Sequence, residues 1–143
     1  MVKKEETLNY WIFQSKPGRY DLRERLVAER EEPWIASRYR TKMKPGDLVF
    51  LWMSGPPEIR GIYGWGRLTS VPFESEDGHR VKVLYQKKLR EFIPVAAVKK
   101  TSALRNLMIL NLAIGTNFWI NEKEGRTICK LMQNDERPKG GAG

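Results

Sequence analysis

Two segments of this 143-residue chain are apolar on both faces of a strand, which restricts the folds that the chain can adopt. The first is LNYWIFQS at residues 8–15, and the second is LVFLWMS at residues 48–54. A strand alternates its side chains between two faces, so apolar residues at nearly every position require cover on both faces. Both segments are therefore predicted to be central, buried strands.

A third strand-like segment, PPEIRGIYGWGRL at residues 56–68, contains Gly61, Gly64 and Gly66. Glycine costs backbone entropy and contributes no side chain to packing, so an ordinary strand contains few of them. Three glycines in one strand indicate a bend, a bulge or a place where something approaches the backbone closely.

The remaining elements are short. An amphipathic helix is expected at 19–30, and a strand at 80–89 follows the turn at Asp77 and Gly78. The segment that follows this helix, with Trp34 at its start, is expected to be irregular. Other expected features are a helix that begins at Pro94, a short return strand in GTNFWI, a last helix capped by Asn121 and Glu124, and a stretch at 102–114 that fits a helical turn or an extended piece.

No internal repeat or domain boundary is visible in the sequence, which has the length of one domain. We expect a single domain over residues 1–143, with its core at about 8–133 and flexible tails at 1–6 and 134–143.

The charge is strongly basic: 26 Lys and Arg against 17 Asp and Glu give a net charge of +9. An excess of this size favours a polyanionic partner, with nucleic acid first and an anionic membrane second, although solubility alone could account for it. The single cysteine, Cys129, excludes an internal disulfide and is expected to be a packed thiol. The sequence has no apolar run of membrane-spanning length and MVKKEETLNY is not a signal peptide, so a cytoplasmic protein without membrane contact is expected.

Catalytic machinery is poorly represented. The only histidine, His79, is expected at a polar hairpin turn, and no metal-ligand or phosphate-loop spacing occurs. We therefore expect no enzyme, no metal and no cofactor, with a pair formed by Asp47 and Lys44 left open as a catalytic alternative.

Aromatic residues next to positive charge are abundant. In RYRTKMK, four cations alternate with other residues, so an extended segment would place them on one side for phosphate contacts and Tyr39 on the other. A solvated edge segment is the alternative. Trp34 lies outside any periodic apolar run and could form a wall of a pocket for a planar ligand. The four candidate phosphate contacts are Arg38, Arg40, Lys42 and Lys44.

Five motifs resemble, in their order along the chain, the EVE domain of the PUA-like superfamily. They are NYWIFQSKPGRYDL, a tryptophan after a short helix, MKPGDLVFLWMSG, EIRGIYGWGRL and IGTNFWI. The resemblance covers roughly residues 8–133. It implies an α+β fold: a strongly curved mixed β-barrel of about five to six strands with helices packed around it. The glycines would let the strand bend, and Tyr63 and Trp65 would be barrel core.

EVE domains are regarded as readers of modified nucleobases and are related to YTH domains, which hold a methylated base in an aromatic cage. The resemblance places the pocket at the end of the first strand, at the tryptophan after the helix, and at the late glycine motif. Trp52 is most simply a core residue but is kept as a candidate. The candidate pocket residues are Gln14, Ser15, Tyr20, Trp34, Ser37, Tyr39, Trp52, Phe73, Thr116 and Asn117.

The function expected on this basis is the binding, without catalysis, of a modified base that is flipped into an aromatic pocket. Modified DNA is the expected partner in preference to RNA. The reader is expected to be a monomer, and a nuclease or another effector would act in trans. The alternatives are an enzyme associated with RNA modification on the same barrel and a sensor of a free nucleotide-like ligand.

Overall fold

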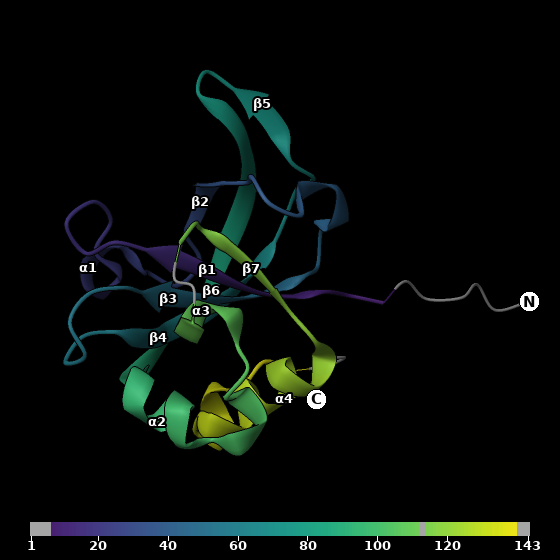
Figure 1. Ribbon diagram of the computed structural model, residues 1–143. Coiled ribbons are helices and arrows are strands. Elements are labelled where there is room, and N and C mark those ends of the chain that lie inside the picture. Colours follow the sequence, from purple (N-terminus) through teal and green to yellow (C-terminus); the bar gives the residue numbers. More distant parts are fainter. Residues whose placement is uncertain (1–6, 112–113, 140–143) are drawn as a thin grey trace, which may run out of the picture.

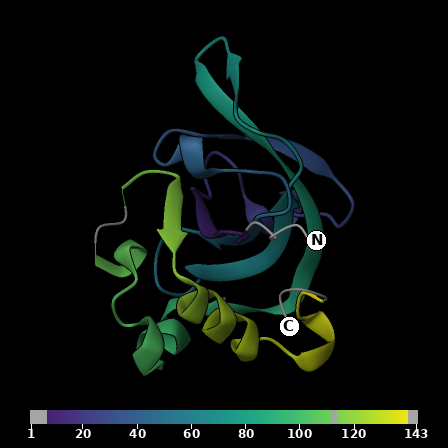
Figure 2. The same ribbon diagram turned by 90° about the vertical axis from the view of Figure 1, so that its right-hand side faces the viewer.

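A computed structural model describes residues 7–111 and 114–139 of the chain (Figure 1). Its centre is a curled sheet with the strand order β2-β6-β4-β3-β1-β7, and β5 pairs with β6. Figure 2 shows the long β6 bending around this curl, with the green and yellow helices α2, α3 and α4 gathered at one end. The expected α+β fold with a strongly curved mixed sheet is confirmed. The strands are β1 (Tyr10–Ser15), β2 (Glu31–Ile35), β3 (Leu48–Met53), β4 (Gly61–Leu68), β5 (Phe73–Ser75), β6 (Gly78–Pro94) and β7 (Asn117–Ile120).

The two doubly apolar segments form β1 and β3, which lie side by side and run parallel near the middle of the sheet. Their alternate side chains enter two separate cores. Ile12 belongs to the core beneath the helices, whereas Trp11 and Phe13 belong to the core inside the curl. This division confirms the prediction that both faces of these strands are covered.

The helices α2, α3 and α4 cover one face of the sheet, whereas α1 contributes Leu22 to the core inside the curl (Figure 1). The α2 helix begins directly after Pro94, and the side chain of Asn121 caps α4 while Glu124 completes the capping box, both as expected. The stretch at 102–114 contains two short turns of helix, and its residues 112–113 lie outside the described part. The helices are α1 (Leu22–Arg25), α2 (Val95–Lys100), α3 (Met108–Asn111) and α4 (Glu122–Leu131), with 3-10 turns η1 (Arg40–Lys42), η2 (Ser102–Leu104) and η3 (Asn134–Glu136).

The glycines of β4 lie where the backbone of β6 approaches most closely. A Cβ atom at Gly64 would collide with the carbonyl oxygen of Lys87, and one at Gly61 would collide with that of Ile93. The register against β3 also shifts next to Leu51, which marks a β-bulge. Tyr63 and Trp65 are both core residues, as expected. Because the bulge interrupts the alternation of side chains along β4, the two residues enter different cores.

Three expectations differ from the structure. The helix expected at 19–30 is limited to α1, because the chain leaves helical geometry at Leu26 and pairs with β6 as the edge strand β2. Trp34 therefore lies on a strand and not in an irregular loop. Residues 134–139 were expected in a flexible tail, but Glu136 is buried and accepts a 2.7 Å hydrogen bond from the backbone N–H of Arg90. The expected tails at 1–6 and 140–143 lie outside the described residues.

Candidate functional site

A pocket of about 380 Å³ opens where the end of β1 meets β2 and the loop before β7. Five of the ten candidate pocket residues line it, although they come from distant parts of the sequence. The lining residues are Gln14, Ser15, Lys16, Arg19, Tyr20, Pro33, Trp34, Ile35, Arg80, Gly115 and Thr116.

The pocket lies beside a seam between the two edge strands of the sheet. β2 and β7 are the ends of the strand order and do not pair with each other. The buried side chain of Asn117 bridges them instead: its Nδ2 donates to the carbonyl oxygen of Ile35 at 3.0 Å, and its Oδ1 accepts from the backbone N–H of Ser37 at 2.9 Å. Asn117 and Ser37 thus lie behind the pocket as supports and do not line it.

Trp34 forms a wall of the pocket, and its ring is fixed in place. Its Nε1 donates a 2.9 Å hydrogen bond to the hydroxyl of Tyr85, and only 7% of the residue is exposed. Its ring packs on Phe13, with centroids 5.9 Å apart, and edge-on against Tyr20 at 5.5 Å. A wall held at several points loses little further entropy when a ligand binds.

Two tyrosines in contact with Trp34, the pocket residue Tyr20 and the buried Tyr85, remain neutral. Burial is the main cause that raises the pKa of Tyr85, and its hydrogen bond with Tyr20 raises it further. Burial likewise raises the pKa of Tyr20, whose hydroxyl lies 2.6 Å from that of Tyr85. Both groups therefore act as uncharged hydrogen-bonding phenols near neutral pH.

The floor of the pocket is polar. The backbone N–H of Gln14 donates to the carbonyl of Thr116 at 2.8 Å, and its side-chain Nε2 donates to the carbonyl of Gly115, also at 2.8 Å. These bonds fix the loop before β7 against β1. The Oγ of Ser15 is buried and has no hydrogen-bond partner among the described residues. A buried hydroxyl in that condition is available to a ligand or to water.

Three cations at the pocket were not among the candidate residues. Lys16 and Arg19 lie in the loop after β1, and Arg80 lies on β6, where it pairs with Asp77 at 2.9 Å. The sequence contains one signal for the first two, because KPGR follows the polar end of the first strand directly.

The cation stripe expected from residues 38–44 does not form as an alternating face. Tyr39 adopts a left-handed backbone with φ of 61°, and the next three residues form the turn η1. Arg38 donates to the carbonyl of Ile114 at 2.7 Å, and the Lys44 ammonium donates to the carbonyl of Thr7 at 2.6 Å. Arg40 and Lys42 are exposed and make no ion pair within the described residues.

The other candidates lie outside the pocket. Tyr39 packs on Trp11, with ring centroids 6.0 Å apart. Trp52 is only 1% exposed and belongs to the core beneath the helices. Phe73 is partly exposed on β5, where Lys82 lies 6.0 Å from its ring.

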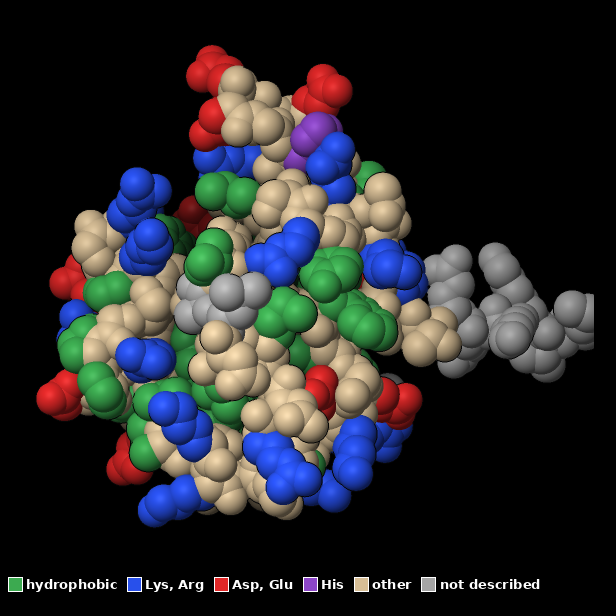
Figure 3. All heavy atoms as spheres, viewed as in Figure 1, with side chains coloured by type: hydrophobic (Ala, Val, Ile, Leu, Met, Phe, Trp, Pro, Cys, Tyr) green, Lys and Arg blue, Asp and Glu red, His purple; other side chains and the backbone are tan. Residues whose placement is uncertain are grey.

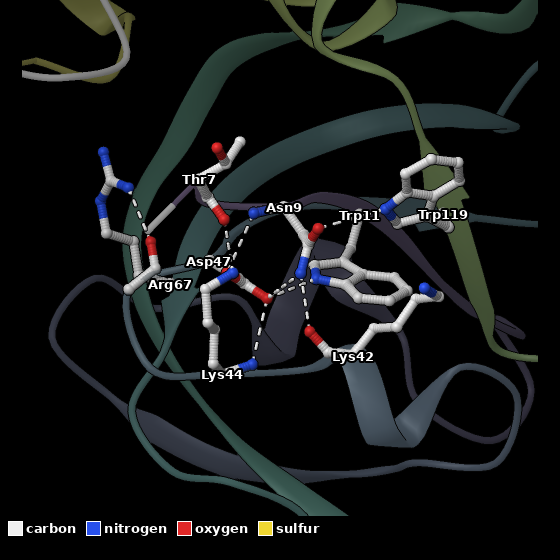
Figure 4. A network of polar contacts seen from close by, with 9 residues as sticks. Thr7, Asn9, Trp11, Lys42, Lys44, Asp47, Arg67 and Trp119 are labelled. Atoms are coloured by element: carbon white, nitrogen blue, oxygen red, sulfur yellow. Dashed lines mark hydrogen bonds and ion pairs between the residues drawn. The ribbon is translucent and has the colours of Figure 1, made fainter. Parts of the chain in front are cut away.

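Asp47 and Lys44, the pair left open as a catalytic alternative, belong to a structural network (Figure 4). Asp47 is completely buried and accepts hydrogen bonds from the Asn9 backbone at 3.0 Å, from Trp11 Nε1 at 2.9 Å and from the Lys44 backbone at 3.1 Å. The Lys44 ammonium lies 3.5 Å from the same carboxylate. With all these donors directed at it, this carboxylate ties β1 to the turn before β3.

Within residues 7–111 and 114–139, no helix has the length and apolar character to cross a membrane. The same part of the chain contains no group of three or more His, Cys, Asp or Glu side chains placed to hold a metal ion. Cys129 is buried, as expected of a packed thiol, and burial raises its pKa to about 11.

Comparison with solved structures finds the same fold in several organisms. A protein of Rhodopseudomonas palustris solved by NMR has a TM-score of 0.74 at 18% identity, over 92% of this chain and 100% of that one. A protein of Agrobacterium tumefaciens has a TM-score of 0.74 at 17% identity, over 92% and 99% of the two chains. Human THYN1, in complex with 5-methylcytosine-containing DNA, has a TM-score of 0.66 at 17% identity, over 92% and 99%.

A search of curated proteins finds no match. The sequence profile of the EVE domain, in contrast, matches residues 9–131. This range contains all seven strands and every residue of the pocket. The chain therefore belongs to the EVE domain family.

Proposed function

We propose that this protein binds nucleic acid and recognises a modified base that leaves its stack and enters the pocket beside Trp34. The observation that carries the proposal is the fixed Trp34 ring, which forms one wall of a pocket that cations also line. Two further findings support it: membership of the EVE family, and a fold shared with human THYN1, which is described in complex with 5-methylcytosine-containing DNA.

The energetics of such binding are reasonable for this pocket. Its volume of about 380 Å³ lies within the range of small-molecule sites, roughly 300–1,000 Å³. Extrusion of a base costs a few kcal/mol, and stacking on an aromatic ring returns roughly 1–3 kcal/mol. Burial of a methyl group adds about 0.8 kcal/mol. Hydrogen bonds from Ser15 and from the loop at Thr116 would supply the remainder and read the base edge.

DNA is the target in this proposal, because DNA is the ligand of the THYN1 complex. The cations Lys16, Arg19 and Arg80 would contact the phosphates on either side of the extruded nucleotide. The proposal includes no catalytic step. A monomeric, intracellular reader would pass its signal to an effector, such as a nuclease, that acts in trans.

The direct test compares oligonucleotides that differ in one base. Binding of DNA with cytosine or 5-methylcytosine, and then with other modified bases, is measured at several salt concentrations. We expect one modified base to bind about 5- to 150-fold more tightly than its unmodified form, equivalent to about 1–3 kcal/mol. We also expect affinity to fall steeply with salt.

Two results would contradict the proposal. Equal affinity for every base would contradict the recognition of a modified base and would indicate a general nucleic-acid-binding protein. Binding of a free modified nucleoside as tightly as of the oligonucleotide, without salt dependence, would instead support the sensor of a small nucleotide-like ligand.

A further inference from the structure

Trp119 on β7 is a large aromatic side chain exposed close to the pocket. It is 47% exposed, whereas its neighbours Phe118 and Ile120 are buried. Trp119 pairs across the strands with Trp11, and Asn117 pairs with Phe13, so both lie on the face of β1 that lines the inside of the curl. Trp119 remains exposed there because β7 is an edge strand with no partner beyond it in the described sheet.

Trp119 lies near the pocket, a short distance along β7. Asn117 holds the seam behind the pocket, and Trp119 follows two residues later along the same strand face. Two residues of a strand span ~7 Å, and the distance from Thr116 is ~10 Å. A nucleotide next to one held in the pocket therefore falls within reach of the Trp119 ring.

The ring of Trp119 is oriented by a chain of hydrogen bonds (Figure 4). Its Nε1 donates to Asn9 Oδ1 at 3.3 Å, and Asn9 Nδ2 donates to the carbonyl of Lys42 at 2.6 Å and to Asp47 at 3.2 Å. An exposed aromatic ring that is anchored at one edge still presents its face to solvent. Such a ring is suited to stacking on a base, because less rotamer freedom is lost on binding.

The surroundings of Trp119 are positively charged. Figure 3 shows exposed hydrophobic side chains near the middle of the face that carries β7, with Lys and Arg side chains beside them. The backbone carbonyl of Lys42 is joined to Trp119 through Asn9, which brings the turn η1, with the exposed side chains of Arg40 and Lys42, close to Trp119. Cations around an exposed aromatic ring match a chain of phosphates and bases.

We infer that Trp119 is a second contact for nucleic acid: it stacks on a nucleotide that flanks the extruded base, and Arg40 and Lys42 contact the phosphates beside it. This inference rests on the proposed function and extends it from a single base to a strand that follows the seam between β2 and β7. The pocket would give preference for the modified base, and Trp119 would give affinity independent of base identity. Protein or a second copy of the chain is the competing occupant of this surface.

The test measures the affinity of Trp119→Ala for modified and unmodified oligonucleotides. We expect binding of both to weaken by about 5- to 150-fold, which corresponds to the loss of one stacked base. The ratio between the two affinities should stay unchanged, and Trp119→Phe should retain most of the affinity. The control is Val27→Ala, which removes another exposed apolar side chain, in the turn between α1 and β2 and outside the pocket lining, and should bind as the unsubstituted protein does.

The possible outcomes separate this inference from the proposed function. Unchanged affinity in Trp119→Ala, while the unsubstituted protein still prefers a modified base, would overturn the stacking role and leave the pocket intact. Loss of self-association with unchanged DNA affinity would assign the surface to a second copy of the chain. Failure of the unsubstituted protein to bind any oligonucleotide would overturn both proposals. For the phosphate contacts, Arg40→Gln with Lys42→Gln should reduce the salt slope by about 0.7–0.9 for each phosphate that is no longer neutralised.

Discussion

Asn117 on β7 accepts a 2.9 Å hydrogen bond from the backbone N–H of Ser37, two residues after the end of β2, and so links two edges that the sheet leaves unpaired. The same side chain donates to the carbonyl of Ile35 at 3.0 Å. In a closed barrel, a row of backbone hydrogen bonds would join β2 to β7. Here the buried amide of Asn117 takes the place of that row, with the bond from Arg38 to the Ile114 carbonyl as a second link, and the pocket lies beside them. We therefore expect the width of the pocket to depend strongly on Asn117.

Substitution of Asn117→Ala is expected to destabilise the protein and to impair the pocket. The change removes two hydrogen bonds and leaves the Ile35 carbonyl and the Ser37 N–H without their protein partner. We expect the free energy of unfolding to fall by about 1–3 kcal/mol. We also expect the preference for a modified base to decrease, because β2 would move relative to β7. Chemical denaturation and oligonucleotide binding measure the two effects.

The matched control is Thr127→Ala on α4, whose hydroxyl donates to the Lys123 carbonyl in an exposed position. That substitution also removes a side-chain hydrogen bond, but far from the seam, so it should change neither stability nor binding appreciably. If Asn117→Ala loses stability but keeps the full base preference, Asn117 supports the fold alone and does not set the pocket.

Substitution of Trp34→Phe tests the pocket wall with little disturbance of the core. Phenylalanine keeps an aromatic ring but removes the donor to Tyr85 and part of the stacking surface. We expect a loss of about 1 kcal/mol in stability and a strong reduction in the preference for the modified base. Salt-dependent binding should remain. Equilibrium unfolding and competition between modified and unmodified DNA measure these effects.

Trp65→Phe is a close control for Trp34→Phe. Trp65 is 8% exposed, against 7% for Trp34, and its Nε1 also donates a hydrogen bond, here to the Glu136 carbonyl at 2.8 Å. It lies in the core beneath the helices, away from the pocket. The Trp65→Phe substitution should therefore lower the free energy of unfolding by a similar amount and leave the base preference unchanged. Equal losses of preference in both variants would mean that Trp34 acts only through folding.

The sequence predicts the centre of the fold well, because the centre depends on strong local patterns. Apolar residues on both faces identify β1 and β3, and the Asn121–Glu124 pair identifies the start of α4. The β2 strand is not evident from the sequence, since Glu31 and Pro33 oppose strand formation locally. Its pairing with β6 comes from tertiary structure, where Trp34 enters the core inside the curl. An edge strand tolerates Pro because one side of its backbone has no partner.

The site could be predicted only in part, and largely through the family resemblance. Gln14, Ser15 and Trp34 are identified in this way and do line the pocket. Of the cations at its mouth, Arg80 could not be placed from the sequence, because it reaches the pocket from β6 through strand pairing. The prediction that the cations at 38–44 form one alternating face was wrong, because Tyr39, with its left-handed backbone, turns the chain into η1.

The pocket cations should account for part of the salt dependence of binding. Lys16→Gln with Arg19→Gln should reduce the slope of log Kobs against log[salt] by about 0.7–0.9 for each phosphate that the two side chains neutralise. The control is Lys99→Gln with Lys100→Gln, which makes the same change in net charge on α2. That pair of substitutions should leave the slope unchanged. Equal slopes for the two double variants would indicate that the basic charge acts through the net field and not through direct pairing with phosphates at the pocket.

The raised pKa values of Tyr20 and Tyr85 predict a loss of stability in alkali. A buried tyrosine with a raised pKa stays neutral in the folded state, whereas the unfolded phenol ionises near pH 10. The unfolded state thus binds fewer protons above that pH, so the stabilisation by Tyr85 is complete below pH 10 and declines above it. The decline has an upper limit of about 1.4 kcal/mol per pH unit.

Comparison with Tyr85→Phe isolates this effect from the other groups that titrate in alkali. The variant should be less stable than the unsubstituted protein at pH 8, because Trp34 Nε1 and the Tyr20 hydroxyl lose their partner. The difference in the free energy of unfolding should shrink as the pH rises above 10. A difference that stays constant from pH 8 to 11 would show that Tyr85 ionises equally in both states, contrary to its burial.

Substitution of Asp47→Asn tests whether this carboxylate supports the structure or takes part in chemistry. Asparagine keeps one oxygen and replaces the other with NH₂, so its nitrogen would face either the backbone N–H of Asn9, which donates to Oδ1, or the N–H groups of Trp11 and Lys44, which donate to Oδ2. Because the site is fully buried, water cannot relieve the mismatch. We expect a loss of about 3 kcal/mol or more in the free energy of unfolding. The exposed Asp135→Asn should change stability little. An Asp47→Asn protein as stable as the unsubstituted one would contradict the structural role and favour the catalytic alternative for Asp47 and Lys44.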